Sequence, residues 1–210
     1  MSKNVRPKSG TGGSMSAANG RHDRDAIALL KDDHREVEQL FKAFEKTSDR
    51  AIVEREHLVG TIVEKLSVHA AIEEQVIYPW ARAHIVDEDL KVLEALEEHH
   101  VVKVLLSELS AMSAEDERYQ AKTTVLIETV RHHVEEEESE LLLDLRDVTT
   151  RAELLDLGRQ LEAAKTTAAG SPDLEASLSS VGSGVGSAIG RAVDVGRGVV
   201  NKVGALTGLD

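Results

Sequence analysis

The sequence has 210 residues, no cysteine, and 25 basic against 38 acidic side chains, a formal net charge of −13 at pH 7. The lack of cysteine excludes disulfides, zinc–thiolate sites, iron–sulfur clusters and thiol catalysis, and the acidic balance argues against binding to nucleic acid phosphates. The N-terminus lacks an apolar signal-peptide core and no stretch approaches the roughly 18 apolar residues of a membrane span, so we expect a cytoplasmic protein.

The first half of the chain predicts an N-terminal arm followed by two long helices. Residues 1–22 are rich in Gly, Ser and Lys, which predicts a disordered arm. From Asp23, apolar residues recur at steps of three and four, and this pattern predicts a helix to Lys46. A polar turn at 47–50 leads into a second helix with the same periodicity. Pro79 should bend or end that helix, because proline has no backbone N–H.

The second half repeats this organisation. A turn at 86–89 precedes a third helix, and Ser113 with the acids that follow resembles an N-cap, so we expect the fourth helix to begin there. Residues 149–165 predict a shorter fifth helix. Long amphipathic helices with short connections predict an all-α fold, an up-down-up-down four-helix bundle over residues 23–165.

Residues 166–210 differ in composition from the bundle and predict a flexible tail. This segment is rich in Gly, Ser and Val. Its apolar residues at 181, 185, 189 and 193 nevertheless recur every four positions, beside a stripe of glycines at the same spacing. We therefore expect a tail that is disordered or conditionally helical, and that in its helical form docks to a membrane surface or to a second copy of the chain.

Histidine and glutamate residues follow a twofold internal repeat. The first and third predicted helices carry Asp33-His34 and Glu98-His99. The second and fourth carry two His-x-x-x-Glu pairs, His69 with Glu73 and His133 with Glu137. Aligning the two halves on these pairs also matches Glu64 with Glu128, Glu74 with Glu138, Ile77 with Leu141 and Arg82 with Arg146. The repeat predicts two helical hairpins that share a symmetric site.

The spacing of these residues favours a metal centre in the core. A step of four residues turns a helix by about 400°, so His69 and Glu73 share one face. Both His-x-x-x-Glu pairs lie on the apolar stripes of their helices and should point inward. A buried carboxylate without a partner is costly, and cations bound by the four imidazoles and two carboxylates would neutralise it.

A count of coordination positions favours two iron ions with room for a ligand. Two octahedral metals offer about twelve positions. Four histidines, two bridging glutamates and an oxo or hydroxo bridge leave about two open, which suits dioxygen, peroxide or nitric oxide. Imidazole and carboxylate ligands with open positions favour iron over structural zinc. The other histidines are interpreted as surface residues (His22, His57, His84) or as exposed or supporting neighbours of the ligands (His100, His132).

These motifs, with Ile-Tyr-Pro after Glu73, resemble the hemerythrin HHE cation-binding family over about Asp23 to Arg146. The resemblance implies a non-haem di-iron centre with six ligands: His34, His69, Glu73, His99, His133 and Glu137. The invertebrate oxygen carriers of the family use five histidines, whereas four are in register here, so Tyr78, Glu138 or water could complete the site. The sequence is similar to actinobacterial hemerythrin-like proteins, which implies handling of peroxide or nitric oxide.

Three functions remain open from the sequence. The first is a di-iron protein that binds or senses dioxygen, nitric oxide or peroxide in redox or nitrosative stress. The second is a catalase-like di-iron enzyme that disproportionates hydrogen peroxide. The third is a structural helical bundle without metal.

Overall fold

A computed structural model of the chain describes residues 24–86 and 89–169. In this part the chain is helical and contains no strand, which confirms the predicted all-α class. The elements in chain order are α1 (Ala26–Lys46), α2 (Ile52–Ile72), the π-helical segment η1 (Glu73–Ile77), α3 (Tyr78–His84), α4 (Asp89–Ser110), α5 (Tyr119–Glu136), the π-helical segment η2 (Glu137–Leu141), α6 (Leu142–Val148) and α7 (Arg151–Ala169). The predicted arm at 1–22, with His22, and the tail beyond residue 169 lie outside the described residues.

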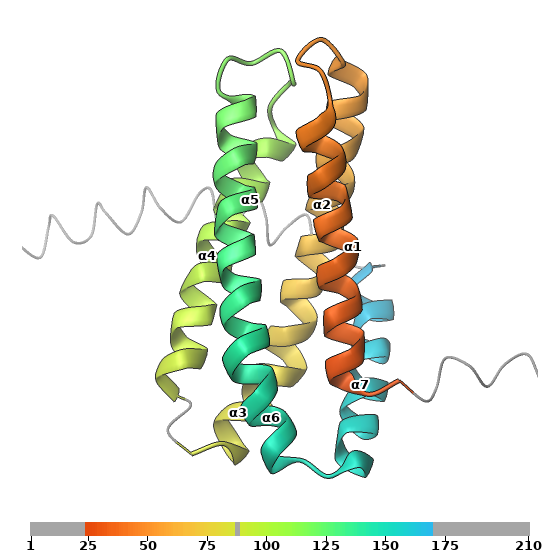
Figure 1. Cartoon of the computed structure of the whole chain (residues 1–210), viewed down its shortest axis with the longest axis vertical. Coiled ribbons are helices and arrows are strands. Elements are labelled where there is room, and N and C mark those ends of the chain that lie inside the picture. Colours follow the sequence, from red (N-terminus) through yellow and green to blue (C-terminus); the bar gives the residue numbers. More distant parts are fainter. Residues whose placement is uncertain (1–23, 87–88, 170–210) are drawn as a thin grey trace, which may run out of the picture.

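The helices form the predicted four-helix bundle with one additional helix on its side (Figure 1). The α1–α2 hairpin packs beside the α4–α5 hairpin, and α7 lies along α1 and α2. The short helices α3 and α6 sit at one end of the bundle. None of the described helices has both the length and the apolar composition that a bilayer crossing requires.

The start of the fourth helix differs from the prediction, which placed it at Ser113. The hydroxyl of Ser113 donates to Oε1 of Glu56 at 3.0 Å and accepts from the N–H of Glu115 at 3.3 Å, but no helix starts at this point. Two successive turns follow, closed by hydrogen bonds from Asp116 N to Ser113 O and from Tyr119 N to Asp116 O. The helix α5 therefore begins only at Tyr119. The N-cap prediction was wrong: Ser113 begins a turn that Glu56 of the other hairpin holds through Ser113 and Ala114.

The fifth helix is present but is not short. It begins after Thr150, whose N–H donates to Glu153 at 2.8 Å while Glu153 N–H lies 3.3 Å from the threonine hydroxyl, a reciprocal capping box. It then continues for 19 residues to Ala169. Leu157 and Leu161 are buried against α1 and α2, so tertiary packing, not propensity alone, sustains its length.

Apolar side chains form two separate buried layers, one toward each end of the bundle. The layer nearer α3 and α6 contains Leu30, Ile77 and Leu161. The other contains Phe41 and Leu106 among its largest side chains. Each buried leucine or phenylalanine contributes about 1.5–3 kcal/mol relative to an exposed one. The predicted histidines and glutamates lie between these layers, so the bundle is stable on both sides of its polar centre.

Gly158 sets how closely α7 approaches the start of α1. A Cβ atom at this position would lie 2.3 Å from the backbone oxygen of Arg24 and 3.2 Å from the nitrogen of Ala26. Backbone atoms cannot move aside as a flexible side chain can. Gly60 in α2 is the opposite case, because a Cβ atom there would meet nothing within 4 Å.

We predict opposite effects of alanine at these two glycines. Gly158→Ala should lower the free energy of unfolding by about 1–3 kcal/mol through overpacking. Gly60→Ala should raise it by about 0.5–1 kcal/mol, because alanine has the higher helix propensity. Urea unfolding followed by circular dichroism measures both. A Gly158→Ala protein as stable as the wild type would show that α7 does not pack against α1 this closely.

Candidate metal centre

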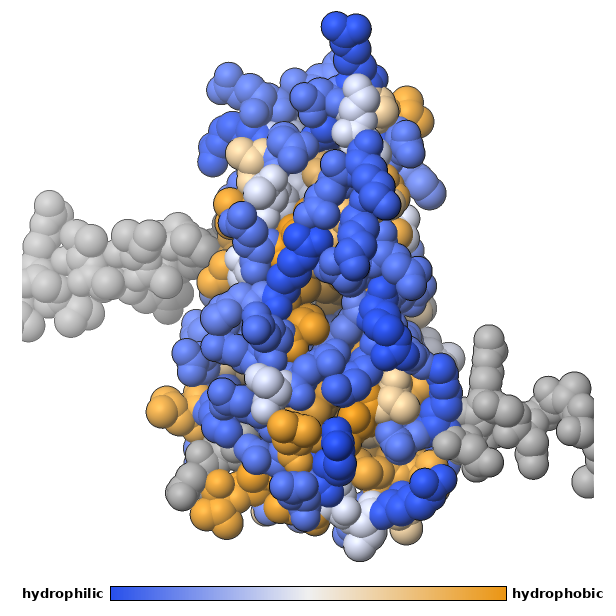
Figure 2. All heavy atoms as spheres, in the orientation of Figure 1, coloured by the Kyte–Doolittle hydropathy of each residue, from blue (hydrophilic) through white to orange (hydrophobic). Residues whose placement is uncertain are grey.

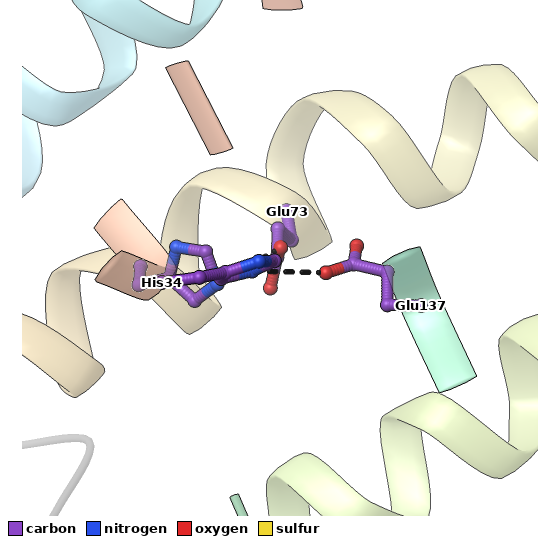
Figure 3. A group of neighbouring side chains, drawn as sticks. His34, Glu73 and Glu137 are labelled. Atoms are coloured by element: carbon purple, nitrogen blue, oxygen red, sulfur yellow. Dashed lines mark hydrogen bonds and ion pairs between the residues drawn. The ribbon is translucent and has the colours of Figure 1, made fainter. Parts of the chain in front are cut away.

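Six buried side chains from both hairpins meet between the two apolar layers. None is more than 6% exposed. Figure 3 shows three of them, His34, Glu73 and Glu137, pointing toward one another from α1, η1 and η2. The structure thus brings together every residue that the repeat singled out: His34, His69, Glu73, His99, His133 and Glu137.

The imidazoles are arranged as two pairs joined by one carboxylate. Nε2 of His34 lies 3.1 Å from Nε2 of His69, and Nε2 of His99 lies 3.2 Å from Nε2 of His133. Glu73 spans the pairs, with Oε1 3.0 Å from His69 Nε2 and Oε2 3.3 Å from His99 Nε2. One oxygen therefore faces each histidine pair, which is the arrangement of a carboxylate that bridges two cations.

The second carboxylate completes one of two groups of potential ligands. Glu137 Oε2 lies 3.2 Å from Nε2 of His34, the contact drawn as a dashed line in Figure 3. Together with His69 and Glu73 these residues form a group whose ligand atoms all lie within 4.8 Å of one another. Glu73 also belongs to the second group, with His99 and His133.

The buried carboxylates lack the hydrogen bonds that their position demands. Among the described residues, no donor reaches either oxygen of Glu73 or of Glu137 with hydrogen-bond geometry. A buried carboxylate without such bonds costs several kcal/mol unless a cation compensates it. Converging imidazole nitrogens and free carboxylate oxygens are the donor set of a transition-metal site, so these residues fit the iron ions that the sequence predicted.

Two π-helical segments place the glutamates, and they recur at matched positions of the hairpins. In η1 the N–H of Tyr78 bonds to the carbonyl of Glu73, five residues earlier. In η2 the N–H of Leu142 bonds to the carbonyl of Glu137. The wider turn aligns residues five apart, and such segments occur mainly at functional sites. Pro79 follows η1 and the chain stays helical to His84, so the proline does not end the helix, and the matching π-turn in the other hairpin forms where no proline follows.

Within each hairpin, the acidic residue just before the first histidine faces Nδ1 of the second histidine. Glu98 Oε2 accepts from Nδ1 of His133 at 2.7 Å. Asp33 occupies the same position in the first hairpin, but its Oδ2 lies 3.7 Å from Nδ1 of His69, a charge contact that is too long for a hydrogen bond. A carboxylate on Nδ1 fixes the tautomer and leaves the lone pair of Nε2 facing the centre.

Across the hairpins, the glutamate that follows each buried glutamate accepts a hydrogen bond from a histidine of the other hairpin. Nδ1 of His34 donates to Glu138 Oε1 at 2.8 Å, and Nδ1 of His99 donates to Glu74 Oε1 at 3.0 Å. Glu138, considered from the sequence as an additional ligand, thus lies on the far side of the His34 ring from the centre, where it also accepts from Lys31. The sequence repeat matched Glu74 with Glu138 but did not reveal this supporting role.

Tyr78 is buried beside one histidine pair. Its hydroxyl lies 3.1 Å from Nε2 of His99, the nitrogen that faces the centre. Burial raises the pKa of Tyr78 well above 10, and the charges of Glu73 and Glu137 raise it further, so the phenol keeps its proton. The matched residue of the other hairpin is Leu142, which makes the surroundings of the two groups unequal.

All four histidines also border a small apolar cavity of about 20 Å³. Its remaining walls are Val37, Leu66, Ala70, Val102, Val130 and Val134. A wider groove of about 530 Å³ between α1 and α5 shares Val37, Val130 and Val134 with it and reaches His34. Figure 2 shows this face, with hydrophobic residues in the hollow and polar side chains around it. The remaining described histidines, His57, His84, His100 and His132, are exposed as predicted.

Comparison with known proteins agrees with this geometry. The model of the hemerythrin HHE cation-binding domain matches residues 25–143, more than half of the chain. The chain belongs to the hemerythrin HHE cation-binding family.

Two relatives place this HHE protein among known sequences and structures. A crystal structure of an HHE domain protein from Mycobacterium kansasii, a homologue of Rv2633c, superposes with a TM-score of 0.61 at 24% identity, covering 70% of this chain and 88% of that one. This likeness supports the fold. A protein of Nostoc sp. strain PCC 7120 described as a DNA nickase is 25% identical over 155 residues, 74% of this chain. The HHE protein spans only 43% of that relative's length.

In the metal-free HHE bundle, His69 and His99 hold protons at neutral pH. Burial alone lowers the pKa of His69, but the negative charge of Glu73 and the nearby carboxylate of Asp33 outweigh it and raise the value to about 10. For His99 burial is likewise outweighed by the carboxylates of Glu73 and Glu74, which gives a pKa of about 9. The pKa of Glu73 lies well below 4.5, because the neighbouring histidines outweigh its burial. Bound metal must therefore displace these protons.

We predict that metal removal changes how stability depends on pH. A raised histidine pKa stabilises the fold below the unfolded value of about 6.5 and loses that contribution as pH rises through the folded value. Metal-free protein should thus lose stability from pH 6.5 to about 10, the folded pKa of His69. Iron-loaded protein should instead lose stability in acid, where protons compete with the metal.

Thermal unfolding across this pH range tests the prediction, with His69→Gln as the comparison. The difference in Tm between metal-free wild type and metal-free His69→Gln should narrow as pH rises. His84→Gln is the control, because His84 is exposed and binds the backbone of Trp80. A difference that stays constant or widens toward alkaline pH contradicts the raised pKa.

Proposed function

We propose that this chain is a non-haem di-iron protein that binds a small oxidant or diatomic ligand, namely dioxygen, nitric oxide or hydrogen peroxide, in redox or nitrosative stress. The observation that carries the proposal is the cavity bordered by all four histidines, two of which, His69 and His99, also face the buried carboxylate of Glu73. Bound iron would supply Lewis-acid and redox chemistry at that cavity.

Each half of the ligand set would hold one iron. His34 and His69 would bind the first and His99 and His133 the second, with Glu73 between them. Glu137 would serve as the second bridging carboxylate, by analogy with Glu73 in the repeat. The outer carboxylates would keep each Nε2 lone pair directed at its metal.

The dimensions of the cavity restrict the ligand to a few atoms. A water molecule needs about 10–15 Å³ by the same measure, and the cavity offers about 20 Å³. Its valine and leucine walls provide no hydrogen bonds, which favours weakly solvated molecules such as dioxygen and nitric oxide over ions. The apolar groove between α1 and α5 is the path that we assign to them.

Tyr78 favours a second candidate function, the catalase-like disproportionation of two hydrogen peroxide molecules to water and dioxygen. Its protonated hydroxyl lies 3.1 Å from His99 Nε2, where it could donate a hydrogen bond to peroxide. Alternatively the phenol would be a further ligand if iron binds beside His99. Leu142 at the matched position offers the first iron no such group.

Two other aspects of the proposal rest on charge and composition. The net charge of −13 would repel a phosphate backbone, so the activity named for the Nostoc relative is not proposed for this chain. Absence of cysteine fits a reducing compartment, and we place the protein in the cytoplasm. A metal-free structural bundle is disfavoured, because only protons on the histidines would then balance two buried carboxylates that accept no hydrogen bond.

We predict about two iron ions per chain after anaerobic loading with Fe²⁺. The double variant Glu73→Ala, Glu137→Ala should lose most of this iron, because both proposed bridges are removed. The double variant His57→Ala, His84→Ala is the matched control and should keep it, because both side chains are exposed. Iron is counted by a chelator assay after gel filtration. Full occupancy in the glutamate variant would end the di-iron proposal.

We also predict that filling the junction between groove and cavity slows ligand binding without removing iron. Val134 lines both spaces, so Val134→Phe should reduce the association rate of nitric oxide with the iron-loaded protein by about tenfold or more. Val125→Phe, an exposed position on α5, should bind at the wild-type rate.

Stopped-flow absorbance measures this rate, and oxygen evolution from peroxide is recorded on the same samples. Peroxide breakdown that Tyr78→Phe lowers would support the catalase-like function. A stable nitric oxide or dioxygen adduct without peroxide breakdown would support binding alone. Equal rates for Val134→Phe and Val125→Phe would contradict the assigned path.

A further inference from the structure

The two hairpins are related by the repeat but differ in what covers them. Helix α7 packs against α1, α2 and η1. Among the described helices, none takes the equivalent position on α4 and α5 (Figure 1). One side of the proposed metal centre is therefore closed by a helix, and the corresponding side is open.

The side chains at matched positions follow this difference. On the covered side the repeat has apolar residues that pack in the core layer beneath α7: Leu29, Leu30, Val68, Ile72 and Val76. On the open side the matched residues are Glu94, Ala95, His132, Glu136 and Glu140. At four of these five positions the open side has a polar residue, and at the fifth Ala95 takes the place of Leu30.

A cavity of about 120 Å³ occupies the open side and leads to the centre. Glu94, Glu98, Glu136 and Glu140 line it, and Ala95 forms part of its wall. Its inner end is formed by two proposed ligands, His133 and Glu137. Lys91 is the one lysine or arginine in this lining, and it pairs with Glu140 and Asp144.

Two carboxylates of this lining, Glu98 and Glu136, form a potential cation site together with the exposed His132. The ligand atoms of Glu98, His132 and Glu136 lie within 4.8 Å of one another, with His132 Nε2 3.3 Å from Glu136 Oε1. Glu98 connects this group to the centre, because its Oε2 accepts from Nδ1 of His133 at 2.7 Å. The side chains of His132 and Glu136 are 63% and 48% exposed, whereas that of Glu98 is 21% exposed.

The inner end of the cavity contains a carboxylate, that of Glu137, which accepts no hydrogen bond from the described residues. Glu137 is 4% exposed, and neither of its oxygens has a hydrogen-bond partner among the described residues. A cation that enters the cavity would therefore move from exposed carboxylates and one imidazole toward a buried, unsatisfied carboxylate. On the covered side, Lys165 of α7 pairs with Asp33, the residue matched to Glu98. A cavity of about 90 Å³ lies there too, but Lys65 and Lys165 line it beside the acids, and none of the six proposed ligands forms its wall.

We propose that this acidic cavity is the path by which Fe²⁺ reaches the buried centre, and that Glu98, His132 and Glu136 form a transient outer binding site at its mouth. The inference rests on the proposed di-iron function. Two carboxylates and one imidazole suit a divalent first-row metal, and their exposure keeps binding weak enough for release inward. The acidic surface raises the local concentration of the cation.

The test measures how fast the metal-free full-length chain takes up Fe²⁺ under anaerobic conditions. The path variant is Glu94→Gln, Glu136→Gln, Glu140→Gln, and the charge-matched control is Glu115→Gln, Glu117→Gln, Glu128→Gln at exposed positions away from the cavity. We expect the path variant to load at least about fivefold more slowly at low salt, with unchanged final iron content, and the control to load within about twofold of wild type.

A second pair of variants blocks the cavity without changing charge. Ala95→Phe fills it, whereas Leu93→Phe places the same ring on an exposed position of α4 that does not line it. Ala95→Phe should load slowly and reach the same final iron content. Loading of either path variant at the rate of its control overturns the proposed path. A wild-type chain that takes up no iron overturns the proposed function itself, so the two failures are distinguishable.

Discussion

The uncompensated charge of two buried glutamates is the constraint on which the rest of the structure depends. Glu73 and Glu137 are at most 4% exposed and have no hydrogen-bond donor within the described chain. Such groups destabilise a fold unless positive charge is brought to them. In the metal-free protein, protons on His69 and His99 supply it, as their raised pKa values indicate. Metal ions would supply it more strongly, and the surrounding residues are arranged for that exchange.

The arrangement around the centre is crossed between the hairpins. Each histidine has its Nδ1 directed at a carboxylate, from its own hairpin for His69 and His133 and from the other hairpin for His34 and His99. The hairpins therefore cannot slide past each other without breaking contacts at the centre. This crossing joins the packing of the bundle to the geometry of its functional site.

The two hairpins place matched histidines and glutamates at the centre, but the residues and helices around these side chains differ between the hairpins. Tyr78 lies beside one histidine pair where Leu142 occupies the matched position in the sequence. Helix α7 closes one side, while the acidic cavity opens on the other. Apolar ligands and cations would approach by different faces, the former through the valine-lined groove and the latter past glutamates. Separate paths allow a dry ligand cavity to exist within a strongly acidic domain.

The sequence by itself determined the helical class, the two-hairpin repeat and the six residues that meet at the centre, because helical periodicity and the four-residue step are local properties. Through the internal match with Glu73 it preferred Glu137 to Glu138 as a ligand, and Glu137 is the one that lies in the buried group. Only the tertiary structure decided the π-turns, the crossed carboxylates and the start of α5, where Glu56 of the other hairpin binds Ser113. It also decided that α7 is long and covers one hairpin. These features depend on contacts between residues far apart in the chain, which no local pattern records.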